Sequence, residues 1–157
     1  MKNLFVTATL TLASFNLYAC PELVGKYNKC HSEIRAMKGE YVINEVRENG
    51  YSVFQVQFID DETGETRNDT IATNGVVVSR KERVPKIGIR VRVDASSKCT
   101  NDAVVTDSQI YFMGGNVGYF LTKIYRTGST LHSDIDGQYT GKEIHKRITC
   151  ELETAAF

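Results

Sequence analysis

The chain has 157 residues, 41% of them hydrophobic, and its 19 Lys and Arg residues are balanced by 19 Asp and Glu residues. This length suits one domain with a single modest core. The basic residues are dispersed among acidic ones, and the densest group, Arg80-Lys81-Glu82-Arg83, is interpreted as a solvated turn. We therefore expect no nucleic-acid partner, because such proteins need a basic face that neutralises phosphates.

The first residues have the pattern of an export signal. Lys2 precedes an uncharged, mostly apolar run over 4–17 that is too short to span a bilayer. A small residue, Ala19, then lies directly before the first cysteine, where a signal peptide would be cut. We expect a signal peptide over 1–19 and one secreted or periplasmic domain over 20–157, with no transmembrane segment in the mature chain.

An alternative interpretation concerns the cleavage site. Leu17-Tyr18-Ala19-Cys20 resembles a bacterial lipoprotein signal, in which the cysteine is lipidated and anchors the protein to a membrane. Lipidation would consume Cys20 and leave three thiols. The even count of four cysteines favours soluble export, so we expect anchoring only if Cys20 is lipidated.

After the signal, apolar and polar residues alternate in segment after segment, which is the period of a β-strand. The clearest case is 86–93, where Ile87, Ile89, Val91 and Val93 share one face. No long stretch has helical spacing. We predict strands near 23–34, 41–48, 51–59, 66–72, 76–81, 86–93, 103–113, 117–126, 130–139 and 142–153.

The connections have the composition of hairpin turns. Asn49-Gly50 and Asn74-Gly75 each lie between two predicted strands, and Asn-Gly favours the type I′ turn because that turn needs positive φ at both central residues. These strand pairs are predicted to be close antiparallel neighbours. Further turns are predicted around Asp60–Gly64, Pro85, Gly114–Asn116 and Arg126–Ser129.

About eight to ten sequential strands without helical crossovers leave a closed up-and-down barrel or a two-sheet sandwich. We favour the barrel. It closes by pairing its first strand, which holds Tyr27, with its last, which holds Ile148, and closure would remove both exposed edges.

Four cysteines in an exported chain indicate two disulfides, with three connectivities available. An extended segment from Cys20 to Cys30 would span roughly 30 Å, far beyond the reach of a disulfide. In the barrel, Cys30 and Cys150 lie on adjacent strands. Cys20 and Cys99, the latter in the polar loop Asp94–Asp102, lie toward one end, so we predict the pairs 20–99 and 30–150.

Leu23-Val24-Gly25-Lys26-Tyr27 resembles the Gly-x-Trp segment that begins lipocalins and related calycins, with Tyr27 in place of the tryptophan. The pattern Cys-Pro-x-Leu-x-Gly-x-Tyr followed by a cysteine also resembles small exported bacterial proteins of uncharacterised function. This resemblance implies a calycin-like or lipocalin-like β-barrel.

The sequence shows no recognisable catalytic or metal-binding motif. His31, His132 and His145 have no partners at zinc-motif spacing, and no Gly-x-Ser-x-Gly segment is present. Gly114–Gly118 is not followed by a P-loop lysine. We expect no metal, no cofactor and no enzymatic activity.

Large side chains that alternation places inward are the candidate ligand-binding residues. In an eight-stranded barrel they either line a cavity for one ligand or fill the core. The leading hypothesis is a non-catalytic protein that binds a small apolar or amphipathic ligand. The candidates are Tyr27, Phe54, Phe58, Phe112, Phe120 and Lys146, the lysine sharing the inward parity of its neighbours.

A protein partner is the alternative. A compact barrel with a filled core would bind it through loops, for example as an inhibitor of a cell-wall enzyme. The candidate loops are the acidic turn Asp60–Glu65 and the turn Gly114–Gly118.

Overall fold

The computed structural model describes residues 20–32, 39–83 and 88–153, so the expected signal peptide over 1–19 lies outside the described residues. The described part is all β, with ten antiparallel strands in one sheet in the order β4-β3-β2-β1-β10-β9-β8-β7-β6-β5. The strands are β1 (Gly25–Ser32), β2 (Gly39–Glu48), β3 (Tyr51–Asp60), β4 (Thr66–Ala72), β5 (Val78–Arg83), β6 (Arg90–Cys99), β7 (Val104–Phe112), β8 (Gly115–Thr127), β9 (Thr130–Tyr139) and β10 (Lys142–Leu152).

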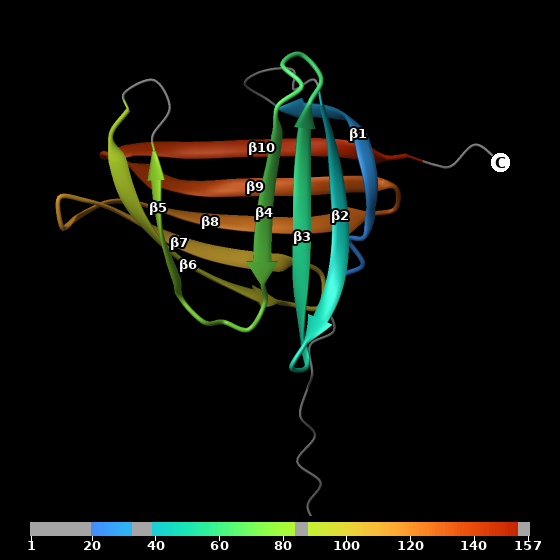
Figure 1. Ribbon diagram of the computed structural model, residues 1–157, viewed down its shortest axis with the longest axis horizontal. Helices are drawn as coiled ribbons and strands as arrows, with labels where there is room; N and C mark the ends of the chain where they lie inside the picture. Colours follow the sequence, from blue (N-terminus) through green and yellow to red (C-terminus); the bar gives the residue numbers. More distant parts are fainter. Residues whose placement is uncertain (1–19, 33–38, 84–87, 154–157) are drawn as a thin grey trace, which may run out of the picture.

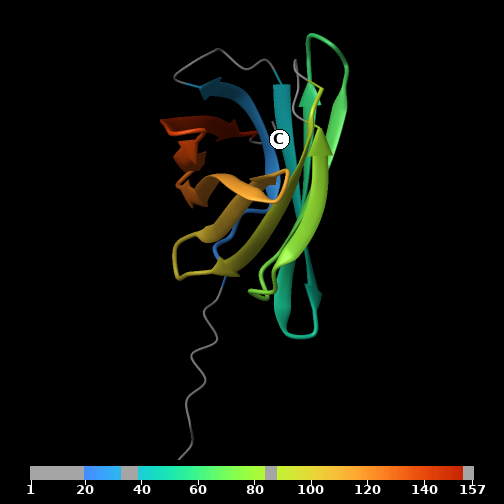
Figure 2. The same ribbon diagram turned by 90° about the vertical axis from the view of Figure 1, so that its left-hand side faces the viewer.

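The sheet curls into a half-barrel. Strands β2 to β4 cross over β8 to β10, and the two groups face each other across the interior (Figures 1 and 2). Alternation favours the curl, because strands such as β2, β3 and β10 carry apolar residues on one face, and curling buries that face. The core lies between these groups, and its most completely buried side chains include Tyr27, Phe54 and Val104. The predicted alternation is confirmed at Val91 and Val93, which are buried on β6.

Two-residue turns join β2 to β3, β7 to β8, β8 to β9 and β9 to β10. At the β2–β3 turn, Glu48 pairs with Tyr51, and Asn49 and Gly50 have φ of 48° and 86°. This hairpin confirms the type I′ prediction at Asn49-Gly50, whereas the same prediction at Asn74-Gly75 is wrong, because Asn74 has no positive φ. The longer β3–β4 turn is held by Asp60, whose Oδ1 accepts hydrogen bonds from the backbone N–H groups of Glu62 and Thr63 at 2.9 and 3.0 Å.

Two predictions about polar segments are wrong. Arg80–Arg83 belongs to strand β5 rather than to a turn. The expected loop Asp94–Asp102 is mostly strand, because β6 stays paired with β7 as far as Cys99 opposite Val104. The serines that made this segment resemble a loop are pairing residues of the strand. The predicted turn at Pro85 lies outside the described residues.

The prediction that closure would remove both edges is also wrong. The first strand does pair with the last, as predicted, but β4 and β5 form no backbone ladder and remain as the two edges. The segment after β4 instead joins β6: Asn74 pairs with Lys98, and the N–H of Gly75 donates to the carbonyl of Ser97 at 2.9 Å. From this point β4 and β5 diverge (Figure 1).

The predicted disulfides, Cys20–Cys99 and Cys30–Cys150, are confirmed. Cys30–Cys150 links β1 to β10, and Cys20–Cys99 ties the segment before β1 to the end of β6. Both bonds are consistent with an extracellular or periplasmic location. The bond to Cys99 leaves Cys20 without a thiol to lipidate.

Candidate ligand-binding cleft

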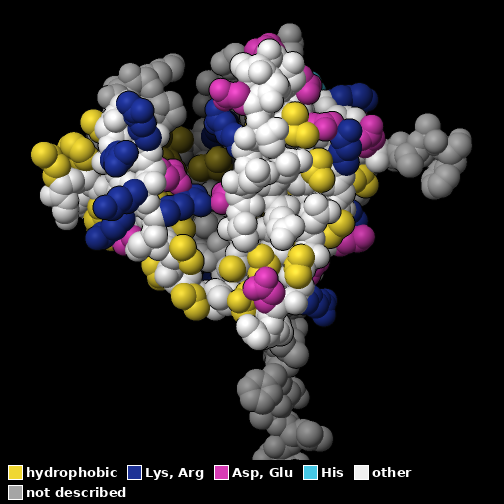
Figure 3. Space-filling model, viewed as in Figure 1, with side chains coloured by type: hydrophobic (Ala, Val, Ile, Leu, Met, Phe, Trp, Pro, Cys, Tyr) yellow, Lys and Arg dark blue, Asp and Glu magenta, His cyan; other side chains and the backbone are white. Residues whose placement is uncertain are grey.

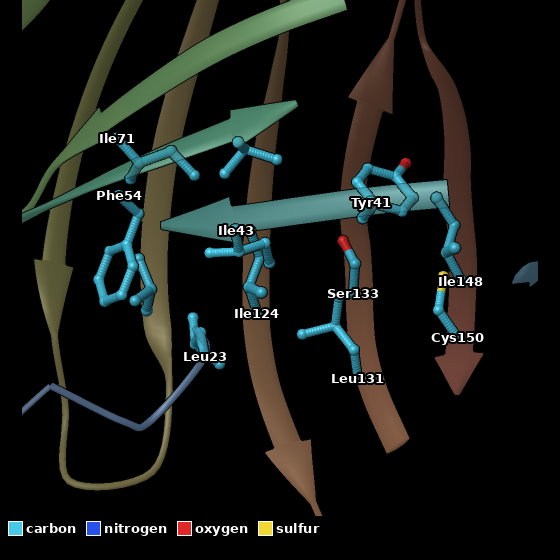
Figure 4. Close-up of a pocket in the computed structure, with 12 residues that line it drawn as sticks. Leu23, Tyr41, Ile43, Phe54, Ile71, Ile124, Leu131, Ser133, Ile148 and Cys150 are labelled. Atoms are coloured by element: carbon cyan, nitrogen blue, oxygen red, sulfur yellow. The ribbon is translucent and has the colours of Figure 1, made fainter. Parts of the chain in front are cut away.

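An inner cavity of about 60 Å³ lies between the two halves of the sheet. Side chains from β2 to β4 meet side chains from β8 to β10 around it (Figure 4). They include Ile43, Phe54, Ile71, Ile124, Leu131 and Ile148. A water molecule occupies about 30 Å³ in the liquid, and drug-sized sites hold about 300–1,000 Å³. The inner cavity alone is therefore too small for an acyl chain.

The wall of the inner cavity is uncharged. Its side-chain oxygens come from the hydroxyls of Tyr41 and Ser133 (Figure 4). Burial raises the pKa of the Tyr41 phenol, although the nearby Arg67 opposes this effect. The phenol is thus protonated at neutral pH, and the cavity suits apolar groups.

The structure places only some of the predicted ligand-binding residues around the inner cavity. Phe54 lines it. Tyr27 is fully buried, and its hydroxyl donates to the carbonyl of Leu23 at 2.7 Å, so this ring belongs to the core. Phe58 packs against Tyr41, with ring centroids 4.8 Å apart. Phe112, Phe120 and Lys146 are half-buried and line neither the inner cavity nor the cleft described next.

A larger space opens where β4 and β5 diverge. We call this space of about 240 Å³ the cleft. Figure 3 shows the hollow between the β4 side and the β5 side of the molecule. Ile71 and Ile124 line both the cleft and the inner cavity. The cleft therefore leads from the surface to the apolar interior.

Small hydroxyl side chains form much of the cleft wall. Strands β6, β7 and β8 contribute Ser97, Thr106, Ser108 and Thr122. Ser97 and Thr106 hydrogen bond to each other at 2.8 Å. Within the described part of the chain, the hydroxyls of Ser108 and Thr122 have no side-chain partner, so they are available to a ligand.

Sequence reasoning missed these residues because it searched for large apolar side chains. A signal was present, since Thr106 and Ser108 share the parity of the buried Val104. Polar residues at inward positions indicate a cavity that reaches solvent rather than a filled core.

An ion pair spans the cleft. Arg80 on β5 donates to Oδ1 of Asp69 on β4 at 3.0 Å, and Arg80 also pairs with Glu82. Burial opposes the charge on the guanidinium, but the two carboxylates outweigh this effect and raise the pKa of Arg80. Arg80 therefore remains charged at neutral pH, and its contact with Asp69 joins β4 to β5 without a backbone ladder.

The described histidines lie away from both spaces. His132 stacks on Tyr125 with ring centroids 4.8 Å apart, and Nδ1 of His145 lies 2.8 Å from Asp136 on the outer face. Among the described residues, no group of three His, Cys, Asp or Glu side chains is placed to hold a metal ion. No helix in these residues has the length and apolar character needed to cross a membrane.

The candidate protein-binding loops differ in character. The acidic turn is tied down by its own Asp60 hydrogen bonds. The β7–β8 turn presents Met113, which is 92% exposed. Comparisons with protein families, curated proteins and solved structures gave no significant match.

Proposed function

We propose that the protein is a non-catalytic binding protein that, after export, holds a small amphipathic molecule in the cleft. The observation that carries this proposal is the composition of the wall: free hydroxyls stand above an aliphatic floor formed by Ile71 and Ile124. Apolar ligand surface would leave water at the floor, at about 25 cal/mol per Å². Polar ligand groups would replace water at Ser108 and Thr122.

The size of the two spaces limits the ligand. The cleft holds about 240 Å³ and the inner cavity about 60 Å³. Together they reach only the lower end of the range for small-molecule sites. We therefore favour a compact amphiphile over a long-chain lipid, and an amphipathic over a purely apolar ligand.

Filling the cleft tests the proposal. Ser108→Phe places a ring in the cleft, whereas Asp107→Phe places the same ring at the exposed neighbouring position on the outer face of β7. The probe is anilinonaphthalene sulfonate, titrated by fluorescence. We expect saturable one-site binding by the wild type, a loss of affinity of about tenfold in Ser108→Phe, and little change in Asp107→Phe.

Two outcomes would contradict the proposal. One is a probe signal that never saturates or that both substitutions change equally. The other is organic extraction of native protein that yields no small molecule, together with no competition for the probe by any short-chain amphiphile.

A further inference from the structure

In the described part of the chain, every two-residue hairpin turn contains a glycine with positive φ. Three of the turns have positive φ at both positions, as type I′ turns require. In the fourth turn, glycine is first, with φ of 60°. The turns are Asn49-Gly50, Met113-Gly114, Gly128-Ser129 and Thr140-Gly141.

Asn74-Gly75 has the same favourable sequence as the Asn49-Gly50 turn but does not form a two-residue turn. Gly75 has a φ of 72°, whereas Asn74 does not have a positive φ and pairs with Lys98. The two strands beside it, β4 and β5, are the edge strands of the sheet. Among the described strands, β4 pairs only with β3 and β5 only with β6, so the remaining edge of each has no partner strand. Every residue of β5 is exposed.

A two-residue turn at Asn74-Gly75 would fix the register of the two strands. The residue before Asn74 would lie opposite the residue after Gly75, the next residue outward opposite the next, and so on along both strands. In this register, residues of the inner face of β4 meet residues of the inner face of β5. Charge and polarity match along the whole length. The pairs are Asp69–Arg80, Arg67–Glu82, Ile71–Val78, Thr70–Ser79 and Asn68–Lys81.

The open structure already contains the first of these pairs. Asp69 and Arg80 are joined at 3.0 Å although no backbone ladder links their strands. A pairing in any neighbouring register of the same parity would set Asp69 opposite Val78 or Glu82 instead. The side-chain contact across the cleft therefore matches the register that the turn would impose.

We propose that β4 and β5 close into an antiparallel hairpin in this register, turning at Asn74-Gly75, and that the half-barrel is the open state of a lateral gate. Closure keeps the β3–β4 and β5–β6 ladders and gives partners to two rows of unpaired backbone groups. It exchanges the Asn74–Lys98 bridge and the hydrogen bond from Gly75 to Ser97 for this ladder.

Closure would cover the cleft, because Asp69, Ile71, Val78 and Arg80 form its rim. A ligand would enter sideways between β4 and β5 and then be enclosed. This part of the inference rests on the proposed function. The pairing itself does not.

A disulfide trap tests the pairing. In the closed register Thr70 and Ser79 are a non-hydrogen-bonded pair on the outer face, with a Cα separation of about 4.5 Å, which a disulfide spans. The variant is Thr70→Cys with Ser79→Cys. The matched control is Asn68→Cys with Ser79→Cys, a diagonal pair about 7–8 Å apart.

Both variants are equilibrated in a glutathione redox buffer, and the linkages are mapped by mass spectrometry. We expect the in-register variant to lose both added thiols to a 70–79 bridge and the diagonal control to keep them. The oxidised protein should also show an NMR contact between the Hα atoms of Asn68 and Lys81, two residues along the ladder. No bridge, equal bridging in the control, or a bridge without this contact would overturn the pairing.

Binding of anilinonaphthalene sulfonate separates the gate from the proposed function. We expect the oxidised variant to exchange the probe at least about tenfold more slowly than the reduced variant, because the cleft is covered. Exchange at the same rate would overturn the gating role. A confirmed ladder with no probe binding in either form would leave the hairpin closure standing and refute ligand binding.

Discussion

At the scale of single residues, large rings cover glycines on neighbouring strands. A Cβ on Gly39 would lie 2.7 Å from Cζ of Phe58, and a Cβ on Gly137 would lie 2.7 Å from Cδ1 of Phe120. Two rings that we expected to line a ligand site thus pack on bare backbone instead. Such aromatic–glycine pairs help a curved sheet keep its register.

Gly137→Ala tests this packing. The added Cβ would meet the backbone oxygen of Tyr119 and the Cα of Phe120, the latter at 2.9 Å, and neither can move without the strand. We expect a loss of about 1–3 kcal/mol in the free energy of unfolding, measured by urea denaturation. Gly115→Ala is the control, because its Cβ would make an ordinary contact at 3.7 Å. Equal losses in both variants would contradict the packing argument.

Local sequence predicts a residue's face well and its distant partner poorly. Alternation predicted the buried face of β6 at Val91 and Val93, and it also placed Phe120 inward. It could not show that Phe120 would lie on Gly137, because that contact depends on the register between β8 and β9. Short hydroxyl residues such as Ser108 carried no apolar signal, so the cleft was not predicted.

At the scale of elements, Asp134 joins the outer faces of three strands. Its carboxylate accepts hydrogen bonds from Nε of Arg147 on β10 at 2.6 Å and from the hydroxyl of Tyr125 on β8 at 3.1 Å. The Arg147 hydrogen bonds, with a smaller opposing effect of burial, lower the pKa of Asp134 below the ordinary carboxyl value. This network holds β8, β9 and β10 together on the side away from the core.

The lowered pKa predicts how acid affects stability. A carboxyl whose pKa is lower in the folded state stabilises the fold above its unfolded pKa, and this contribution is lost as the pH falls through the folded pKa. We expect Asp134→Asn to lower the free energy of unfolding by about 1 kcal/mol at pH 7. The difference from the wild type should shrink as the pH falls below about 4.

Urea denaturation at a series of pH values measures this effect. Glu48→Gln, at an exposed position of β2, removes a carboxylate without removing such a network and is the control. A difference between Asp134→Asn and the wild type that stays constant down to the acid limit would show that the loss comes from packing rather than from charge.

The β4–β5 connection shows an element-level limit of sequence reasoning. Asn74-Gly75 and the complementary strands beside it favour a hairpin, and that is what we predicted. The structure instead pairs Asn74 with Lys98, a contact that local patterns do not encode. Sequence analysis thus indicated one of the two states that we infer for this segment, and the structure shows the other.

At the scale of the whole molecule, the pairing of β1 with β10 holds the half-barrel together. Among the described residues, β1 pairs with β2 over Gly25–Tyr27 and no further, and His31 and Ser32 have their partners in β10. The Cys30–Cys150 bond fastens this second half of β1. Its cysteines could be paired correctly from sequence because a meander that joins its first and last strands leaves few other choices.

Removing each disulfide separately tests this division of roles. The two bonds span 120 and 79 residues, so the restriction of the unfolded chain differs little between them, and each removal should cost about 4 kcal/mol.

The local effects should differ. Cys30→Ser with Cys150→Ser frees the second half of β1, whereas Cys20→Ser with Cys99→Ser frees the end of β6 beside Thr73, whose hydroxyl lies 3.6 Å from Cys20 Sγ. Hydrogen exchange should therefore rise in β1 and β10 in the first variant and in β6 and the β4–β5 connection in the second. The same exchange pattern in both variants would mean that the bonds act only on the unfolded chain and that neither fastens a particular part of the sheet.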